Sequence, residues 1–412
     1  MKRRNCIVGQ SGGPTIAINA SLAGIIHRAH ALNEFNHVYG MINGIMGLLE
    51  GRYMDLLEEF DTGDKINFLK QTPAMYLGSC RFKLPTHKEC IDTFEKIFSI
   101  LEDLNITDFY YIGGNDSMDT VMKLDDYAKS IHSPIKFIGI PKTIDNDLMG
   151  TDHTPGFGSA AKYVATSMLE IVHDSSIYQL QSVTIVEIMG RNAGWLTAAS
   201  ALARNEYNQA PDLIYLPETA FNKEKFLTDI REVFKHKQCV VIAVSEGIRD
   251  ESGHFLDDDS KYAKKDAFGH VLHSGTGKLL ESLVFQEFQC KVRSIELNVL
   301  QRCAMHIGSK TDLNESFVIG QAAVEESLSG NSGRVMGFKR ISDKPYLIET
   351  MSSDVRSVAN LEQKIPRQWI HPNGHDISEK LYHYLAPLIQ GEVHISYSNG
   401  IPNYYSCKHL SK

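Results

Sequence analysis

Short runs of β-branched and aromatic residues recur along the chain, and most of them end at a glycine or a polar loop. These runs predict buried strands at residues 6–9, 109–112, 136–140, 183–188 and 239–244. Between them, residues 15–30 and 159–173 repeat apolar positions with the period of a helix. Strands that alternate with helices are typical of an α/β fold, in which helices cover both faces of a parallel sheet.

The length of the chain adds a domain organisation to this pattern. A chain of 412 residues exceeds what one hydrophobic core usually organises, so we expect two doubly wound, Rossmann-like domains with the active site in the cleft between them. Residues 248–278 are the least regular stretch and contain three consecutive aspartates at 257–259. We expect an insertion loop there, with a solvated acidic run, followed by a helix from about Gly277.

Three loops that follow predicted strands carry groups suited to phosphate. They are SGGP at 11–14, GGNDS at 113–117 and PKTIDND at 141–147. Glycines let backbone N–H groups approach a phosphate, and the helix expected from near Asp119 adds the positive end of its dipole. One such loop alone could serve only a tight turn. Because the carboxyl ends of parallel strands meet at one crevice, the three loops together predict a single phosphate site.

The third loop also supplies groups for proton and phosphoryl transfer. Lys142, Asp145 and Asp147 place one cation and two carboxylates close together in the sequence. Transfer of a phosphoryl group to a sugar hydroxyl needs a base for the hydroxyl proton and positive charge near the phosphoryl oxygens. These residues therefore indicate a sugar-phosphate kinase.

Composition bears on the partners and the location. The chain has 42 Lys and Arg against 50 Asp and Glu and a net charge of −8, which predicts neither a broad basic face for nucleic acid nor a basic membrane anchor. Its seven cysteines form no CxxC pair, which favours reduced thiols and the cytoplasm. The apolar run after the basic N-terminus stops at Gly9, so we interpret it as a first strand and not as a signal peptide or membrane span.

Further motifs follow at fixed places along the chain, namely MGRNAG at 189–194, SEG at 245–247 and LQR at 300–302. With these added, the chain resembles the 6-phosphofructokinase family from residue 5 to at least residue 312. Within that family it resembles the pyrophosphate-dependent branch, because members that use ATP commonly carry glycine at the positions of Asp116 and Lys142.

Charge gives those two positions a physical meaning. A carboxylate at Asp116 would repel the α-phosphate of ATP, since two unit charges about 4 Å apart interact by roughly 4 kcal/mol at an effective dielectric constant of about 20. Lys142 would add positive charge beside the transferring phosphoryl group. Both substitutions favour pyrophosphate over a nucleotide as the donor.

The resemblance implies a role for each matched residue. Asp145 corresponds to the general base, and it forms the catalytic set with Lys142 and Asp116. Pyrophosphate would be bound by Gly12, Gly113, Gly114, Ser117 and Arg81. Fructose 6-phosphate would be bound by Thr143, Ile144, Asp145, Met189, Gly190, Arg191, Glu246, Arg293, Val299 and Arg302. The two arginines of the last set, at 293 and 302, would hold the 6-phosphate, since a guanidinium fork binds two oxygens at once.

Three positions depart from the family pattern. Asn115 stands where many relatives carry a magnesium-binding aspartate, so Mg²⁺ at Asn115 would be held chiefly by pyrophosphate oxygens and a nearby carboxylate. Val299 replaces an aromatic or histidine partner of the sugar phosphate. Ser182 lies in a region where some bacterial ATP-dependent members place a cross-subunit arginine.

The reaction that the resemblance implies is the Mg²⁺-dependent, reversible conversion of fructose 6-phosphate and pyrophosphate into fructose 1,6-bisphosphate and phosphate, a step of glycolysis. In relatives one arginine reaches in from a neighbouring subunit, so we expect a homodimer or homotetramer. We expect residues 1–157 plus 302–360 to form the pyrophosphate domain, and residues 158–301 plus 361–412 to form the sugar-phosphate domain.

Two other functions stay open from the sequence. One is an ATP-dependent 6-phosphofructokinase that tolerates Asp116. The other is a non-catalytic regulatory subunit that binds sugar phosphate, which Asn115 and Val299 motivate. The sequence does not decide whether longer sugars such as sedoheptulose 7-phosphate are accepted, or whether an effector regulates the protein.

Overall fold

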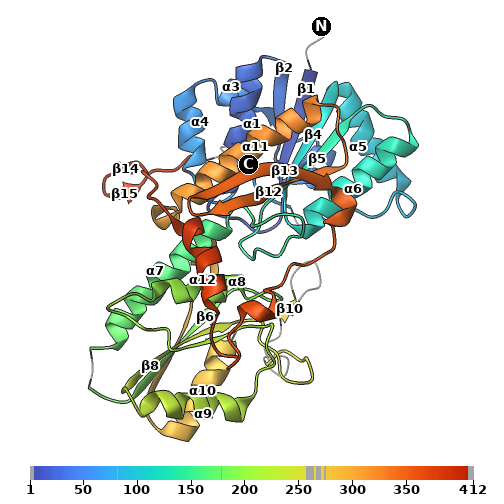
Figure 1. The fold of residues 1–412 in the computed structure, drawn as a ribbon. Helices are drawn as coiled ribbons and strands as arrows, with labels where there is room; N and C mark the ends of the chain where they lie inside the picture. Colours follow the sequence, from blue (N-terminus) through green and yellow to red (C-terminus); the bar gives the residue numbers. More distant parts are fainter. Residues whose placement is uncertain are drawn as a thin grey trace.

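Two sheets, each covered by helices, make up the part of the chain that the structure describes. The structure is a computed structural model, and it describes residues 4–80, 82–177, 179–256, 264–265, 271–272 and 275–406. In Figure 1 the first sheet lies above the second, and the chain passes from the first to the second and back. The predicted α/β fold, with two doubly wound, Rossmann-like sheets, is therefore confirmed.

The first sheet has the strand order β13-β12-β5-β4-β1-β2-β3. Its strands are β1 (Arg4–Gln10), β2 (Phe35–Met41), β3 (Tyr53–Asp55), β4 (Ile106–Gly113), β5 (Lys136–Pro141), β12 (Arg334–Asp343) and β13 (Tyr346–Asp354). The five inner strands run parallel, whereas β3 and β13 close the two edges with antiparallel pairs. In the centre, Ile7 of β1 pairs with Tyr39 of β2 and with Phe109 of β4.

Successive residues of each inner strand point to opposite faces of this sheet. Val8 and Tyr110 pack under α1 (Ile18–Leu32) and α11 (Lys310–Leu328), which also pack against each other. Ile7 and Phe109 pack under α5 (Ile91–Asp103) and α6 (Asn115–Ser130) on the other face. Because both faces are covered, the middle of the inner strands is mainly apolar, as at residues 6–9 of β1 and 109–113 of β4.

The second sheet is parallel throughout, with the order β11-β6-β8-β7. Its strands are β6 (Ser182–Ile188), β7 (Leu213–Tyr215), β8 (Cys239–Ser245) and β11 (Lys291–Glu296). Helices α7 (Phe157–Ser175) and α8 (Trp195–Ala199) cover one face, and α9 (Lys223–Phe234) and α10 (Thr276–Phe288) cover the other.

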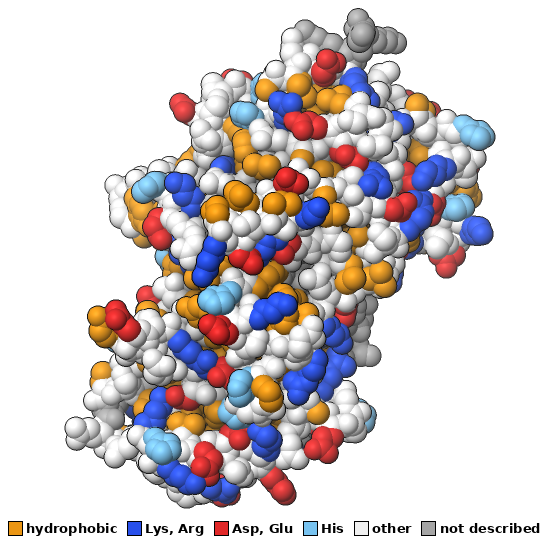
Figure 2. All heavy atoms as spheres, in the orientation of Figure 1, with side chains coloured by type: hydrophobic (Ala, Val, Ile, Leu, Met, Phe, Trp, Pro, Cys, Tyr) orange, Lys and Arg blue, Asp and Glu red, His pale blue; other side chains and the backbone are white. Residues whose placement is uncertain are grey.

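Smaller elements complete the described part. They are α2 (Gly44–Leu49), α3 (Leu56–Glu59), α4 (Gly63–Lys70), α12 (Glu379–Leu385), β9 (Lys264–Lys265), β10 (Val271–Leu272), β14 (Tyr397–Ser398), β15 (Ile401–Pro402) and the 3-10 helices η1 (Ser200–Ala203), η2 (Asn298–Arg302), η3 (Met305–Ile307), η4 (Val355–Ser357), η5 (Arg367–Trp369) and η6 (Ala386–Ile389). No helix among the described residues is both long enough and apolar enough to cross a bilayer. In the view of Figure 2, Lys and Arg side chains are interspersed with Asp and Glu.

The five predicted strands lie inside β1, β4, β5, β6 and β8, and the helix expected from about Gly277 is α10. Two helix starts were predicted wrongly. Helix α1 begins at Ile18 and not at 15, because the Thr15 carbonyl accepts a hydrogen bond from the Ala74 amide. Helix α6 begins at Asn115 and not near Asp119, because the amides of residues 117 and 118 already donate to the Gly114 carbonyl. The acidic run 257–259 lies outside the described residues.

The end of the described chain returns to the helices of the first sheet. The ring of Tyr405 packs against those of Phe60, Phe68 and Tyr76, and its amide donates to the Thr72 hydroxyl. Before that, α12 packs with the helices of the second sheet. The domain boundaries that we expect from the sequence stay a prediction.

Candidate active site

A cleft of about 740 Å³ opens where the strands of both sheets end. It is lined by residues that follow β1, β4, β5, β6, β8 and β11. Of the predicted site residues, the following line it: Gly12, Gly114, Asn115, Asp116, Ser117, Lys142, Thr143, Ile144, Asp145, Met189, Arg191, Glu246, Val299 and Arg302. The three loops at 11–14, 113–117 and 141–147 therefore meet at one cleft, as expected, and their binding of phosphate stays a prediction.

Lys142 joins two of these loops. It follows β5 directly, and its ammonium group donates a 2.6 Å hydrogen bond to the Gly13 carbonyl of the first loop. A Cβ added to Gly12 would lie 3.1 Å from the Lys142 Nζ, so a larger residue would crowd the cation. The side chain is only 3% exposed, and this burial lowers the pKa of Lys142 to about 8 against the opposing effect of Asp145.

The first turn of α6 forms the next part of the wall. A Cβ on Gly113 would lie 1.9 Å from the Ser117 hydroxyl oxygen, so this glycine allows the turn to pack and is not itself part of the lining. The Asn115 Oδ1 is buried without a hydrogen-bond partner among the described residues. Asp116 is exposed in the same turn, where its charge opposes the attraction of the helix N-terminus for an anion.

The loop after β5 carries two carboxylates with perturbed acidity. Burial raises the pKa of Asp145, although Lys142 and Arg302 work in the opposite direction. Burial, together with the charges of Asp145 and Glu362, raises the pKa of Asp147 to about 7. Such shifts are typical of groups that exchange protons or bind cations.

The opposite wall comes from the second sheet. Gly190, after β6, has a positive φ of 140°, and its amide donates to the Glu246 carboxylate over 3.2 Å. A Cβ there would lie 2.6 Å from the Ala193 carbonyl oxygen, so the turn requires glycine. Burial raises the pKa of Glu246 to about 8, which favours its neutral form, and this form donates a hydrogen bond as well as accepting them.

The segment after β11 adds Val299 and Arg302 to this wall. Val299 is 49% exposed at the cleft, and its side chain offers no hydrogen bond. A Cβ on Gly13 would lie 3.0 Å from the Arg302 Nη1, so the guanidinium reaches across to the first phosphate loop. Arg302 thereby brings a second positive charge close to Lys142 and Asp145.

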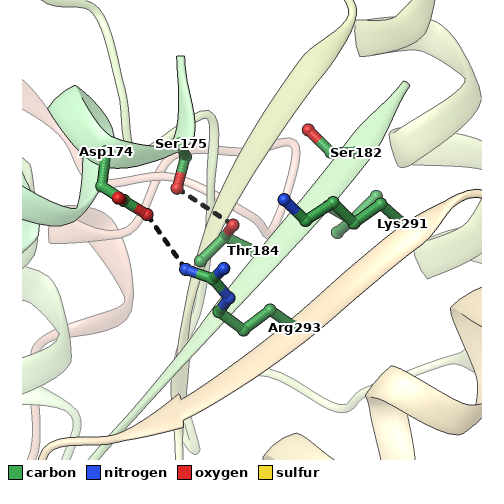
Figure 3. Close-up of a pocket in the computed structure, with 7 residues that line it drawn as sticks. Asp174, Ser175, Ser182, Thr184, Lys291 and Arg293 are labelled. Atoms are coloured by element: carbon green, nitrogen blue, oxygen red, sulfur yellow. Dashed lines mark hydrogen bonds and ion pairs between the residues drawn. The ribbon is translucent and has the colours of Figure 1, made fainter. Parts of the chain in front are cut away.

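Arg293 lies away from the cleft, whereas Gly113 and Gly190 lie next to residues that line it. Figure 3 shows Arg293 on β11, beside Lys291, where its guanidinium donates a 2.9 Å hydrogen bond to Asp174. Its side chain is about half exposed, and it does not line the large cleft. Arg81 lies outside the described residues.

Sequence reasoning missed several residues that line the cleft, among them Thr15, Glu187, Asn192, Glu296, Asn298 and Glu362. Asn192 lies inside the motif MGRNAG and Glu187 lies two residues before it, so their place in the lining follows from that motif. Glu362 has no such signal, because it comes from the connection between β13 and α12. It accepts a 2.8 Å hydrogen bond from the Asn192 amide at the rim.

Comparisons with known proteins agree with this geometry. A family model described as Phosphofructokinase matches residues 5–325. The pyrophosphate–fructose 6-phosphate 1-phosphotransferase of Xanthomonas campestris is 39% identical and covers 100% of this chain and 98% of its own. The crystal structure of a pyrophosphate-dependent phosphofructokinase from Nitrosospira multiformis is 34% identical, with a TM-score of 0.88 over 98% of this chain and 97% of its own. An ATP-dependent 6-phosphofructokinase of Vibrio parahaemolyticus, 33% identical, covers 64% of this chain and 77% of its own.

Proposed function

The chain belongs to the phosphofructokinase family, and from this premise we propose how its cleft works. The protein is an enzyme that transfers a phosphoryl group from pyrophosphate to the 1-hydroxyl of fructose 6-phosphate, giving fructose 1,6-bisphosphate and phosphate. The observation that carries this account is the buried Lys142 and the half-buried Asp145 beside the exposed Asp116 in one cleft. The pair supplies a cation and a base, and Asp116 disfavours a nucleotide donor.

The proposed transfer uses groups from both walls. Asp145 accepts the proton of the sugar 1-hydroxyl while that oxygen forms a bond to the nearer phosphorus of pyrophosphate. The bond from this phosphorus to the bridging oxygen breaks, and phosphate leaves with that oxygen. Lys142 stabilises the charge on the transferring group, and the sugar lies along Met189, Arg191 and Glu246 of the opposite wall.

Magnesium fits this cleft only with help from the substrate. The described residues contain no cluster of three His, Cys, Asp or Glu side chains that could hold a metal ion. The unpartnered Asn115 Oδ1 and the Asp147 carboxylate supply possible oxygen ligands for a metal ion in the lining. Mg²⁺ prefers oxygen ligands of this kind together with phosphate oxygens. We therefore propose that Asn115 and Asp147 would hold Mg²⁺ jointly with pyrophosphate, whose charge the ion neutralises.

The alternatives from the sequence lose support for separate reasons. An ATP-dependent enzyme is disfavoured by Asp116 and Lys142, and the full-length similarity is to pyrophosphate-dependent proteins. A regulatory subunit would not need the base and the cation, and both line the cleft. We also propose the cytoplasm as its location, which the free thiols of its described cysteines support.

Reversibility is proposed from the chemistry of the donor, since a phosphoanhydride without nucleotide lies closer in free energy to the product ester. Incubating fructose 1,6-bisphosphate with phosphate and Mg²⁺ should therefore form fructose 6-phosphate and pyrophosphate. Phosphorus NMR would follow both products at once. A reaction that proceeds only toward the bisphosphate, with no pyrophosphate formed at any substrate ratio, would contradict this proposal.

We also propose a homodimer in which Arg293 serves the cleft of the partner subunit. The support is its position, since the half-exposed guanidinium lies away from the cleft of its own chain. Arg293→Met should then raise the KM for fructose 6-phosphate by about 10-fold to 100-fold, because a charge-assisted hydrogen bond to a phosphate is lost. Steady-state kinetics with varied fructose 6-phosphate measures this.

Hybrid dimers show whether Arg293 acts in the cleft of the partner subunit or in the cleft of its own chain. Arg293→Met and Asp145→Asn subunits are unfolded together, mixed and refolded. If Arg293 acts across the interface, each mixed dimer has one cleft with both Asp145 and Arg293. Random pairing makes about half of the dimers mixed, so about a quarter of all clefts regain activity. If Arg293 acts within its own chain, the mixture shows no more activity than the average of the two pure variants.

A further inference from the structure

The family match ends at residue 325, but the part of the chain beyond it touches the loop that carries the base. We call residues 143–148 the base loop, residues 151–156 the return segment and residues 326–406 the C-terminal part. Contacts between the C-terminal part and the base loop occur at two places, one at α12 and one before it. Nothing in the cleft chemistry described above uses these contacts.

Asn146 is the centre of the first contact. It lies between Asp145 and Asp147, is 1% exposed, and adopts a left-handed backbone conformation with φ of 55°. Its Oδ1 accepts a 2.9 Å hydrogen bond from the Thr154 amide of the return segment, and its Nδ2 donates over 3.0 Å to the Tyr384 hydroxyl. The amide side chain therefore points into the protein, while the carboxylates on both sides of it line the cleft.

Tyr384, on α12, connects the base loop to the return segment. Its hydroxyl donates a 2.6 Å hydrogen bond to the Asp152 carbonyl and accepts the bond from Asn146. Arg340 of β12 holds both partners, because its guanidinium donates to the Asp152 carboxylate and to the Tyr384 carbonyl at about 3.1 Å each. The buried hydroxyl is thus fixed from two directions.

The second contact lies at the end of the base loop, one and two residues after Asn146. The Gln363 amide donates a 2.7 Å hydrogen bond to the Asp147 carbonyl, and Leu148 forms an antiparallel bridge with Glu362. The Gln363 carbonyl in turn accepts from the Trp195 indole of α8, on the side of the second sheet. The C-terminal part therefore links the base loop to the wall that faces it.

We propose that the C-terminal part positions the base, and that Tyr384 and Asn146 are the positioning residues through which it acts. The proposal rests on the proposed function, in which Asp145 takes the sugar proton. A general base works only within hydrogen-bond reach of its proton, and a displacement of about 1 Å can cost about 100-fold in rate. Contacts that hold the loop at residues 146–148, directly after Asp145, would limit such a displacement.

Tyr384→Phe tests the first contact, because it removes one oxygen and keeps the ring. The Asn146 Nδ2 and the Asp152 carbonyl would each lose a buried partner. We expect kcat to fall by about 5-fold to 10-fold, with the KM of both substrates within about twofold of the parent. Tyr382→Phe is the matched control, since Tyr382 lies on the same helix with its ring against His383, and it should leave kcat unchanged.

Asn146 variants test the same hydrogen bond to Tyr384 from the base loop. They replace Tyr384→Phe in the test if that variant fails to fold. Asn146→Gly keeps the left-handed conformation and loses the side-chain hydrogen bonds, whereas Asn146→Ala also disfavours that conformation. We expect kcat to fall in the order parent, Gly, Ala. Tyr384→Phe added to Asn146→Gly should cost little more, because both changes break one link. Full additivity of the two effects would overturn the proposal.

A second readout does not depend on turnover. Hydrogen exchange of the amides in residues 143–156 should become about 10-fold faster in Tyr384→Phe than in the parent and in Tyr382→Phe. Unchanged exchange, or faster exchange with unchanged kcat, would each refute the positioning role. A parent that lacks pyrophosphate-dependent turnover would instead refute the proposed function, and the exchange data would still decide whether the C-terminal part holds the loop.

Discussion

Replacing Asp145 with Asn should lower kcat by about 100-fold to 10,000-fold, the usual contribution of a general base. The amide occupies the same volume in the cleft but cannot accept the proton of the sugar hydroxyl. Folding and sugar binding should persist, because the substitution removes a buried charge without opening a cavity. Steady-state kinetics and circular dichroism measure the two effects. A kcat close to that of the parent would exclude Asp145 as the base.

Asp147→Asn is the matched control, two residues along the same loop. If Asp147 helps to hold Mg²⁺, raising the Mg²⁺ concentration should restore much of the activity of this variant but none of that of Asp145→Asn.

The pH dependence of activity is a second test of the roles of Asp145 and Lys142. Asp145 must be ionised and Lys142 protonated, so activity should fall below the raised pKa of Asp145 and again above about pH 8, where Lys142 loses its charge. The acid limb should disappear in Asp145→Asn.

Replacing Lys142 with Met should lower kcat with pyrophosphate by about 100-fold to 1000-fold, the usual cost of losing one donor that stabilises transition-state charge. Methionine keeps most of the length of the side chain but has no charge and no hydrogen bond to the Gly13 carbonyl. Lys136→Met, at the other end of β5, is the matched control and should change kcat little. Equal effects of the two variants would mean that Lys142 acts only on stability.

Asp116→Gly added to Lys142→Gly should make turnover with ATP measurable while turnover with pyrophosphate falls. Asp116 is exposed, so the repulsion of a nucleotide phosphate lies nearer the value in water, about 1 kcal/mol or a factor of about five, than the value for a buried pair. The single change at 116 should therefore shift the ratio of ATP to pyrophosphate turnover by only about fivefold. A double variant that still rejects ATP completely would place donor selection elsewhere in the cleft.

Much of the fold and of the cleft follows from local pattern. Runs of apolar residues that end at glycine or polar loops predict β1, β4, β5, β6 and β8, because strands buried on both faces have no polar alternation. The loops at their carboxyl ends must then meet, which brings Gly12, Gly114 and Lys142 together without any knowledge of the long-range packing.

The remaining features depend on contacts that sequence spacing does not encode. The start of α6 at Asn115 depends on the turn at Gly114, and the side chain of Arg293 faces Asp174 because of the pairing of β11 with β6. Glu362 reaches the cleft from a connection of no regular pattern, and its position is set by a bridge to Leu148. The sequence around Tyr384 indicates only an apolar residue on an amphipathic helix. The structure alone shows that its hydroxyl accepts a hydrogen bond from Asn146.

The most direct test of the central claim compares the two donors on the unaltered protein. Initial velocities are measured with fructose 6-phosphate and Mg²⁺, with either pyrophosphate or ATP, and the bisphosphate is detected through an aldolase-coupled assay. Turnover with pyrophosphate and little or none with ATP is the result expected from Asp116 and Lys142. Turnover with ATP alone would contradict the donor assignment, and no turnover with either donor, despite binding of the sugar phosphate, would contradict catalysis itself.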